Sequence, residues 1–457
     1  MLNGRLKIFT DFTEITDQNI GEVLAQAYPI FCVNLKDIEY LYWYYRGLQP
    51  ILARKKEVRP EINNKIVENH AYSIVQFRTG YLLEKPIQYV ARKDTTDIEM
   101  VNLYNDFNVI ESKESSDKKI ANWRAIVGQG YRLALPNKNY TKGSLNDSPY
   151  SINTVSPFKG FVIYSSDIGE KPMVGVVVLK QKDATGKEVI KLQAWTDKKY
   201  YIFDYGSKTV VKKEAHTFGM IPLIEYPNGE ERMGAFEMVL PLLDAINNIQ
   251  SNRVDGIEQF IQAIMVFKNV EITKEMLQTL KDLGAINISD SGEVKANVEY
   301  LSQELNQEQV QKLKSDLLSN IYKICGIPQQ NGSGGGNNGA TEIHDGWTEA
   351  EAKAQEDELS FKTSEQQFIK LSLNIAKTLT HNKVNLSVAD IDIKFTRRNY
   401  ENLTQKVNAL NIMLASGKVA PKLAFATCGL FADPEEAYLA SQQYIEEQSQ
   451  KGGNNND

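Results

Sequence analysis

A glycine motif is the pattern in this chain most suggestive of chemistry. Gly334, Gly336 and Gly339 have the Gly-x-Gly-x-x-Gly spacing of dinucleotide-binding loops and precede a predicted helix. That motif holds a pyrophosphate only where a strand leads into the glycines, so that the phosphates meet the following helix N-terminus. Here a helical segment and Pro328 come first, and 328–340 is so glycine-rich that composition alone explains the spacing. We therefore interpret it as a non-catalytic loop. No Gly-Lys-Ser or Gly-Lys-Thr sequence occurs, which argues against an ATP motor.

The other residues with chemical potential are isolated in the sequence. Asp390 and Asp392 form an Asp-x-Asp triplet; on a strand both carboxylates would face one side, where they could bind a cation. A solvated strand face is the simpler interpretation. The histidines have no second ligand at metal-binding spacing, and they are His70, His216, His344 and His381. We predict no catalytic, metal or cofactor site, and hence no enzyme.

Composition narrows the class of protein. The chain has 457 residues, 42% of them hydrophobic and 24% charged, which suits a globular protein of several domains. No apolar run is long enough for a transmembrane helix, and the start lacks the apolar stretch of a signal peptide, so we expect synthesis in the cytoplasm. A net charge of −6 argues against tight, sequence-independent binding of nucleic acid. The cysteines are far apart and predicted to be reduced and mostly buried: Cys32, Cys325 and Cys428.

The first half of the chain changes character once. Residues 11–130 are predicted to be mainly helical, with apolar spacing that continues from Ile62 to Phe77. The aromatic cluster Tyr40–Tyr45 is expected in the core or in a subunit interface. Short β-rich runs separated by turns then predict an antiparallel sheet over about 157–226, closed by Pro222 and Pro227.

Two long amphipathic helices with a small insert between them are predicted next. The first covers 235–268, with a late start or a kink because of Pro241 and Gly256. The insert, 269–305, is predicted to hold a short helix (275–283) and two strands (285–288 and 294–301). The second long helix covers 306–327.

The remaining third is predicted to be mainly helical. A long helix is expected over 341–380, with Gly346 as a bend, followed by a strand over 390–395. Asp433 and Pro434 have the residue types of a helix start. The last residues, 448–457, are predicted to be a disordered tail. The loop 328–340, held between two helices, suggests a moving contact surface.

This order of parts resembles the portal proteins of long-tailed (siphovirus-type) double-stranded DNA bacteriophages. Four regions carry the resemblance: Asn64–Asn69 with Gly80–Tyr89; Gly219–Asn228 with Leu243–Asn248; Gly339–Glu342 with Glu349–Lys353; and Phe395–Asn399 with Ser416–Val419 and Asp433–Glu436. Each is weak alone, but together they follow the family's order from about residue 35 to 445.

The resemblance implies an α+β, mainly helical portal fold in a ring of about twelve subunits at one capsid vertex, with DNA passing through its centre. It implies the following parts: wing, 1–234 and 341–395; first stem helix, 235–268; clip, 269–305; second stem helix, 306–327; tunnel loop, 328–340; crown, 396–447. The clip would meet the packaging motor (terminase large subunit) and later the head-completion or adaptor proteins, and the wing would meet capsid and scaffold proteins. The protein would then belong to the virion.

The resemblance also suggests residues for the channel. Asp255 and Glu258 on the first stem helix, with Lys312 and Lys323 on the second, are candidates to line it; ion pairs with neighbouring subunits are the alternative. The tunnel loop is predicted to be the most mobile internal segment and to point toward the axis, with Gly346 as a hinge. Its residues are Gln329, Gln330, Asn331, Gly332, Ser333, Gly334, Gly335, Gly336, Asn337, Asn338 and Gly339. Two other hypotheses stay open: another ring-forming or scaffolding virion protein, and a nucleotide-using enzyme.

Overall fold

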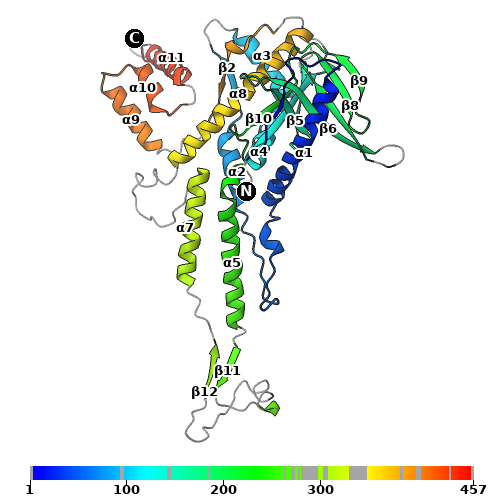
Figure 1. Cartoon of the computed structure of the whole chain (residues 1–457). Helices are drawn as coiled ribbons and strands as arrows, with labels where there is room; N and C mark the ends of the chain where they lie inside the picture. Colours follow the sequence, from blue (N-terminus) through cyan, green and yellow to red (C-terminus); the bar gives the residue numbers. More distant parts are fainter. Residues whose placement is uncertain are drawn as a thin grey trace. The chain divides into compact units, whose positions relative to one another are not determined.

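The computed structural model is a mixed α+β protein with several sheets (Figure 1). The residues it describes are 4–92, 97–141, 146–182, 186, 188–261, 264–268, 273–275, 278, 297–301, 307–328, 347–380, 384–397, 403–431 and 434–453. Contacts divide the chain into two compact units. The first comprises Met1–Arg46, Ala71–Met238 and Tyr322–Asp457, and the second comprises Gly47–His70 and Val239–Ile321.

A six-stranded sheet of the first unit is covered by one long helix. The sheet order is β1-β5-β6-β7-β8-β9, with β1 parallel to β5 and the other neighbours antiparallel. The strand bounds are Ile8–Thr10, Gly160–Ser165, Pro172–Lys182, Glu188–Trp195, Lys199–Asp204 and Thr209–Ala215. Helix α1 (Ile20–Tyr45) packs Leu24 and Phe31 onto the face that carries Ile163. The antiparallel sheet predicted over about 157–226 is therefore confirmed for residues 160–215, whereas residues 223–227 pair in another sheet and β1 was not foreseen.

The other face of this sheet packs on a three-stranded sheet, β10-β3-β4. Its strands are Leu223–Pro227, Gln129–Pro136 and Tyr150–Val155. Alternate residues of a strand point to opposite faces, so Leu223 packs between the sheets while Ile224 and Tyr226 face the next layer. A Cβ at Gly175 of β6 would lie 2.7 Å from the Cβ of Leu223, so only glycine permits this close approach of the sheets.

The largest core of the first unit surrounds the long helix α8 (Trp347–Thr380). Three shorter helices contribute to the same unit, namely α2 (His70–Leu82), α3 (Ile98–Ile110) and α4 (Lys113–Val127). Strand β13 (Ile391–Lys394) pairs with β2 (Gln88–Ala91), which confirms the strand predicted near residue 390. Phe361 and Phe368 of α8 are fully buried in this core.

The apolar spacing from Ile62 to Phe77 was misinterpreted as one helix. Helix α2 starts only at His70, and residues 63–69 are neither helix nor strand. Of the aromatic cluster, Tyr44 and Tyr45 are buried, whereas Tyr40 and Trp43 are 41% and 46% exposed. The cluster therefore divides between the core and the surface.

The second unit contains two long helices and a small ribbon (Figure 1). Helix α5 (Leu240–Ile261) is followed by β11 (Ile264–Lys268), which pairs antiparallel with β12 (Asn297–Leu301), and α7 (Gln307–Cys325) returns. The first long helix was thus predicted to be too long at both ends. Residues 237–239 form a 3-10 turn, and the β-branched and aromatic residues of 264–268 form a strand. Within the described residues, β12 matches part of the strand predicted over 294–301.

Three helices form a small cluster near the end of the chain. They are α9 (Leu403–Ala415), α10 (Pro421–Cys428) and α11 (Pro434–Gly453), and they surround a core that includes Phe425 and Cys428. Pro434 begins α11 as predicted. The disordered tail predicted from 448 is wrong as far as Gly453, since the helix continues to that residue.

Candidate functional site

The helix pair α5 and α7 is joined by polar side chains. Arg253 of α5 donates from Nε to Gln307 Oε1 (2.7 Å) and from Nη1 to Gln311 Oε1 (2.8 Å). One turn further along α7, Lys314 Nζ donates to Gln250 Oε1 at 3.4 Å. These residues of α7 lie three to four apart, so they define the face of α7 that meets α5.

Two other faces of α7 remain exposed in the single chain. Leu313 and Ile324 are 51% and 46% exposed and lie eleven residues apart, which is about three helical turns. Lys312 and Lys323 have the same separation, are both exposed, and lie roughly 100° further around the helix. The helix therefore presents an apolar strip and a polar strip side by side, in addition to its contact with α5.

Helix α5 carries a buried row of polar side chains that bind backbone. Asn247, Ser251 and Asp255 are spaced four apart and are at most 2% exposed. Their oxygens accept from the N–H groups of Glu68 (2.8 Å), Ile66 (2.9 Å) and Asn64 (2.7 Å), respectively. Four residues of helix rise about 6 Å, close to the advance of two residues of extended chain. The segment 62–69 thus runs antiparallel to α5 with every second N–H bonded to it.

Asp255 is the most heavily bonded member of this row. It also accepts from Asn64 Nδ2 (2.9 Å) and from Lys56 Nζ, and Arg54 Nη2 lies 3.3 Å away. Burial raises the pKa of Asp255, but the bonds from Lys56 and Asn64 outweigh burial and hold that pKa below its ordinary value. The carboxylate is therefore an ionised junction between α5 and segment 47–70.

The four residues predicted to line a channel fall into two groups. Asp255 is buried within its own chain, and Glu258 lies less than a turn further along the same face, half-buried. Lys312 and Lys323 share the exposed polar strip of α7. The predicted tunnel loop, 329–339, and the predicted hinge Gly346 lie outside the described residues.

The Asp-x-Asp interpretation as two carboxylates on one strand face is wrong. Asp390 belongs to a short 3-10 turn, where its carboxylate accepts from Ser387 N at 2.9 Å and Ser387 Oγ at 2.7 Å, and only Asp392 lies in β13.

Among the described residues no group of His, Cys, Asp and Glu is arranged to hold a metal ion. Burial lowers the pKa of His216, whose ring bonds the carbonyl of Thr196. In the described part of the chain, no helix is long and apolar enough to cross a membrane.

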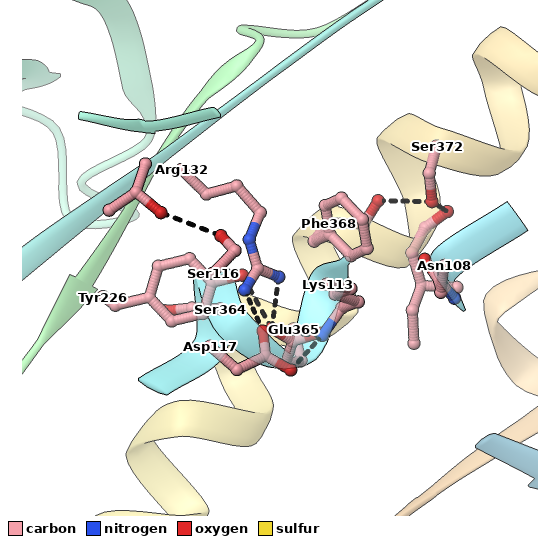
Figure 2. A network of polar contacts seen from close by, with 12 residues as sticks. Asn108, Lys113, Ser116, Asp117, Arg132, Tyr226, Ser364, Glu365, Phe368 and Ser372 are labelled. Atoms are coloured by element: carbon pink, nitrogen blue, oxygen red, sulfur yellow. Dashed lines mark hydrogen bonds and ion pairs between the residues drawn. The ribbon is translucent and has the colours of Figure 1, made fainter. Parts of the chain in front are cut away.

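Sequence reasoning missed a buried ionic network in the first unit (Figure 2). Glu365 of α8 is fully buried and pairs with Arg132 Nη1 of β3 (2.6 Å) and Lys113 Nζ of α4 (3.1 Å). Lys113 and Arg132 also pair with Asp117. Tyr226 Oη donates to Glu365 Oε1 at 2.8 Å. Two cations and two anions thus fix α8 against the sheet and α4.

The pKa values of the two buried acids, Glu365 and Asp117, are shifted in opposite directions. Burial opposes ionisation of both carboxylates. At Glu365, Arg132 and Lys113 overcome that effect and hold its pKa below the ordinary value, whereas the pKa of Asp117 is raised by burial. One sequence signal for the network existed: Glu365 lies between Phe361 and Phe368 on the apolar stripe of α8.

Comparison with known proteins identifies the family. The family model described as phage portal protein, SPP1 Gp6-like, matches residues 30–453. This chain belongs to that portal protein family. It is also similar to the portal protein of Bacillus phage SPP1, with 20% identity over 411 residues, which cover 84% of this chain and 77% of that protein.

Family membership has plain consequences. Portal proteins are structural, non-enzymatic components of the virion, so the nucleotide-using enzyme hypothesis falls. The family implies an oligomeric ring at a capsid vertex through which DNA passes.

Proposed function

We propose that this protein forms the ring-shaped conduit through which the phage genome is packaged, retained and ejected. In this proposal the ring contains about twelve copies, each contributing one α5–α7 pair to the wall of the channel. The insert between the two helices docks first the terminase large subunit and later the head-completion or adaptor proteins. The wing, 1–234 with 341–395, meets the major capsid and scaffold proteins.

The surface of α7 is the observation that carries this proposal. A single chain leaves Leu313 and Ile324 half exposed on a helix that α5 contacts along one face. These two side chains lie in line along α7, and a contact with a neighbouring copy would bury both of them. In a ring the strip packs on the neighbouring copy, and the adjacent polar strip is left for the channel.

The proposed lining rests mainly on Lys312 and Lys323, with Asp316 between them on the same exposed strip. Glu258 remains a candidate because it is only half-buried. Asp255 is not included, since Lys56 and Asn64 already occupy its carboxylate.

The overall charge suits passage of DNA better than capture. Double-stranded DNA carries one charge per about 1.7 Å of its axis, and a protein that neutralises several phosphates binds it tightly. This chain has a net charge of −6. The two exposed lysines of the polar strip on α7 are three helical turns apart, so they do not form a continuous cationic surface.

Assembly tests the ring. We expect purified protein to give perforated rings in negative-stain images and a matching oligomer in analytical ultracentrifugation. Leu313→Glu should weaken assembly, because it places a charge in the apolar strip. Ser315→Glu is the matched control, since Ser315 is exposed on roughly the opposite side of α7. Monomer at all salt and protein concentrations, or equal assembly of both variants, would contradict the proposal.

The tunnel loop, 328–340, is proposed from the family's order of parts. Shortening it by several glycines should leave rings intact but impair DNA packaging or retention. Normal packaging would make the segment a spacer, and loss of rings would make it an assembly element. The alternative function, another ring-forming or scaffolding virion protein, predicts rings that no terminase engages and that never take up DNA.

A further inference from the structure

Arg78 of α2 lies where α2, α8 and the last turn of α7 meet, and these residues all belong to the first unit. Its Nη1 donates to the carbonyl oxygen of Cys325 at the end of α7 (3.3 Å). Its Nε donates to Asp357 Oδ2 of α8 at 3.0 Å, and Nη2 donates to the same oxygen. Arg78 and Asp357 are only 8% and 6% exposed, so the guanidinium and carboxylate are shielded from water. One side chain therefore bonds both α7 and α8.

The last turn of α7 has a backbone carbonyl, that of Cys325, which accepts from Arg78. The N–H of Ile327 donates to Tyr322 O (2.8 Å) and that of Gly326 to Lys323 O (3.3 Å), which is the Schellman arrangement of a helix C-terminus. These bonds do not use the carbonyl of Cys325, and a cation at the negative end of a helix is favourable. The guanidinium of Arg78 thus satisfies a carbonyl that the Schellman bonds leave free.

The last turn of α7 also touches α8 directly. Gly326 has a φ of +64°, and a Cβ there would lie 3.0 Å from the Cβ of Lys353 in α8. A side chain here would crowd Lys353 and would need a strained φ, so the glycine and the Arg78 contacts bring the two helices together by independent means.

Helix α2 holds the beginning of α8 as well. The ring of Trp347, the first residue of α8, packs with Phe77 and Tyr81 at centroid distances of 6.2 and 5.8 Å. Tyr81 Oη donates to Glu351 Oε2 at 2.7 Å. On the other side of Asp357, Arg124 Nη2 lies 3.4 Å from Oδ1.

We propose that Arg78 is a positioning residue that couples the last turn of α7 to α8, so that the helices on either side of residues 329–346 are held together through α2. Displacement of the end of α7 is then transmitted to α8 rather than absorbed between them. The coupling concerns the folded chain itself and does not depend on the proposed conduit function.

The thiol of Cys325 is a built-in reporter of this junction. It is 3% exposed, and burial raises its pKa to about 12, so it reacts only when the junction opens. The experiment is maleimide labelling of the full-length chain under native conditions in a C32S/C428S background. Arg78→Gln should raise the labelling rate of Cys325 at least about tenfold, the factor expected for losing charge-assisted hydrogen bonds. Arg78→Lys should give an intermediate rate, because an ammonium cannot bond a carboxylate and a carbonyl as a planar fork does.

Two controls separate local opening from general destabilisation. Lys118→Gln removes a charge from an exposed pair with Glu114 and should leave the rate unchanged. In a C32S/C325S background, Cys428 reports on a core formed by α9, α10 and α11. Arg78→Gln should not accelerate its labelling. Equal acceleration of both thiols, or an unchanged rate at Cys325, overturns the proposal; if Arg78→Gln fails to fold, the same comparison made with Arg78→Lys decides.

Discussion

Replacement of Glu365 by glutamine should destabilise the first unit strongly. The network in Figure 2 contains two cations and two anions, so its charges sum to zero, and Glu365→Gln leaves a net positive charge in a fully buried place. Removing one partner of a buried ion pair costs about 3–5 kcal/mol, because the remaining charge is neither hydrated nor neutralised. Against a total stability of about 5–15 kcal/mol, this is a large fraction.

The assay is urea unfolding followed by tryptophan fluorescence, with Lys118→Gln as the surface control. That lysine is 55% exposed in its pair with Glu114, so its loss should cost less than about 1 kcal/mol. Adding Lys113→Met to Glu365→Gln restores a net charge of zero and should recover part of the stability. If Glu365→Gln shifts the unfolding midpoint no more than Lys118→Gln does, the buried network stabilises the first unit no more than a surface ion pair, which contradicts the prediction.

Three further changes test the second unit and the end of α7. Asp255→Asn should lower the free energy of unfolding by about 1.5–3 kcal/mol. Because the folded-state pKa of Asp255 is depressed, its stabilisation is complete above about pH 5 and is lost as the pH falls below about 4 toward that lowered pKa, so the variant should lose part of the acid dependence seen by urea unfolding between about pH 7 and about pH 3. Ser251→Ala leaves the N–H of Ile66 without its acceptor and should cost about 1–2 kcal/mol, with faster hydrogen exchange at that amide; unchanged exchange would refute the bond. Gly326→Ala should lower the melting temperature more than Gly417→Ala, which has a similar φ of +61° but no atom within 4 Å of the added Cβ; equal shifts would leave only backbone strain.

The sequence predicted elements well where their periodicity was simple. Helix α7 has one clear apolar stripe and begins and ends within two residues of the prediction. The spacing of Ile257, Ile261 and Ile264 also suggested a helix, but it cannot distinguish the last turn of α5 from the first residue of β11. Residues 264–268 form a strand because they pair with β12, a partner that the local sequence does not reveal.

The contacts of charged residues were less predictable than the helices that carry them. Asp255 looked like an exposed acid on a helix, yet its partners Lys56 and Asn64 lie almost two hundred residues earlier in the chain. Segment 62–69 was assigned to a helix because Ile62 and Ile66 are four apart. Its actual conformation depends on acceptors supplied by α5 and not on its own residues.

The row of polar side chains on α5 also determines when segment 62–69 can fold during synthesis of the chain. The bonds from residues 64, 66 and 68 reach acceptors 191, 185 and 179 positions later in the chain. At a translation rate of about 5–20 residues per second, segment 62–69 waits roughly ten to forty seconds for its acceptors to leave the ribosome. During that interval the six-stranded sheet, the three-stranded sheet and α1 can already form, since their residues precede α5. A nascent chain therefore gains its second unit late, and α5 and α7, for which we propose contacts with other copies, follow the sheets and α1 in synthesis.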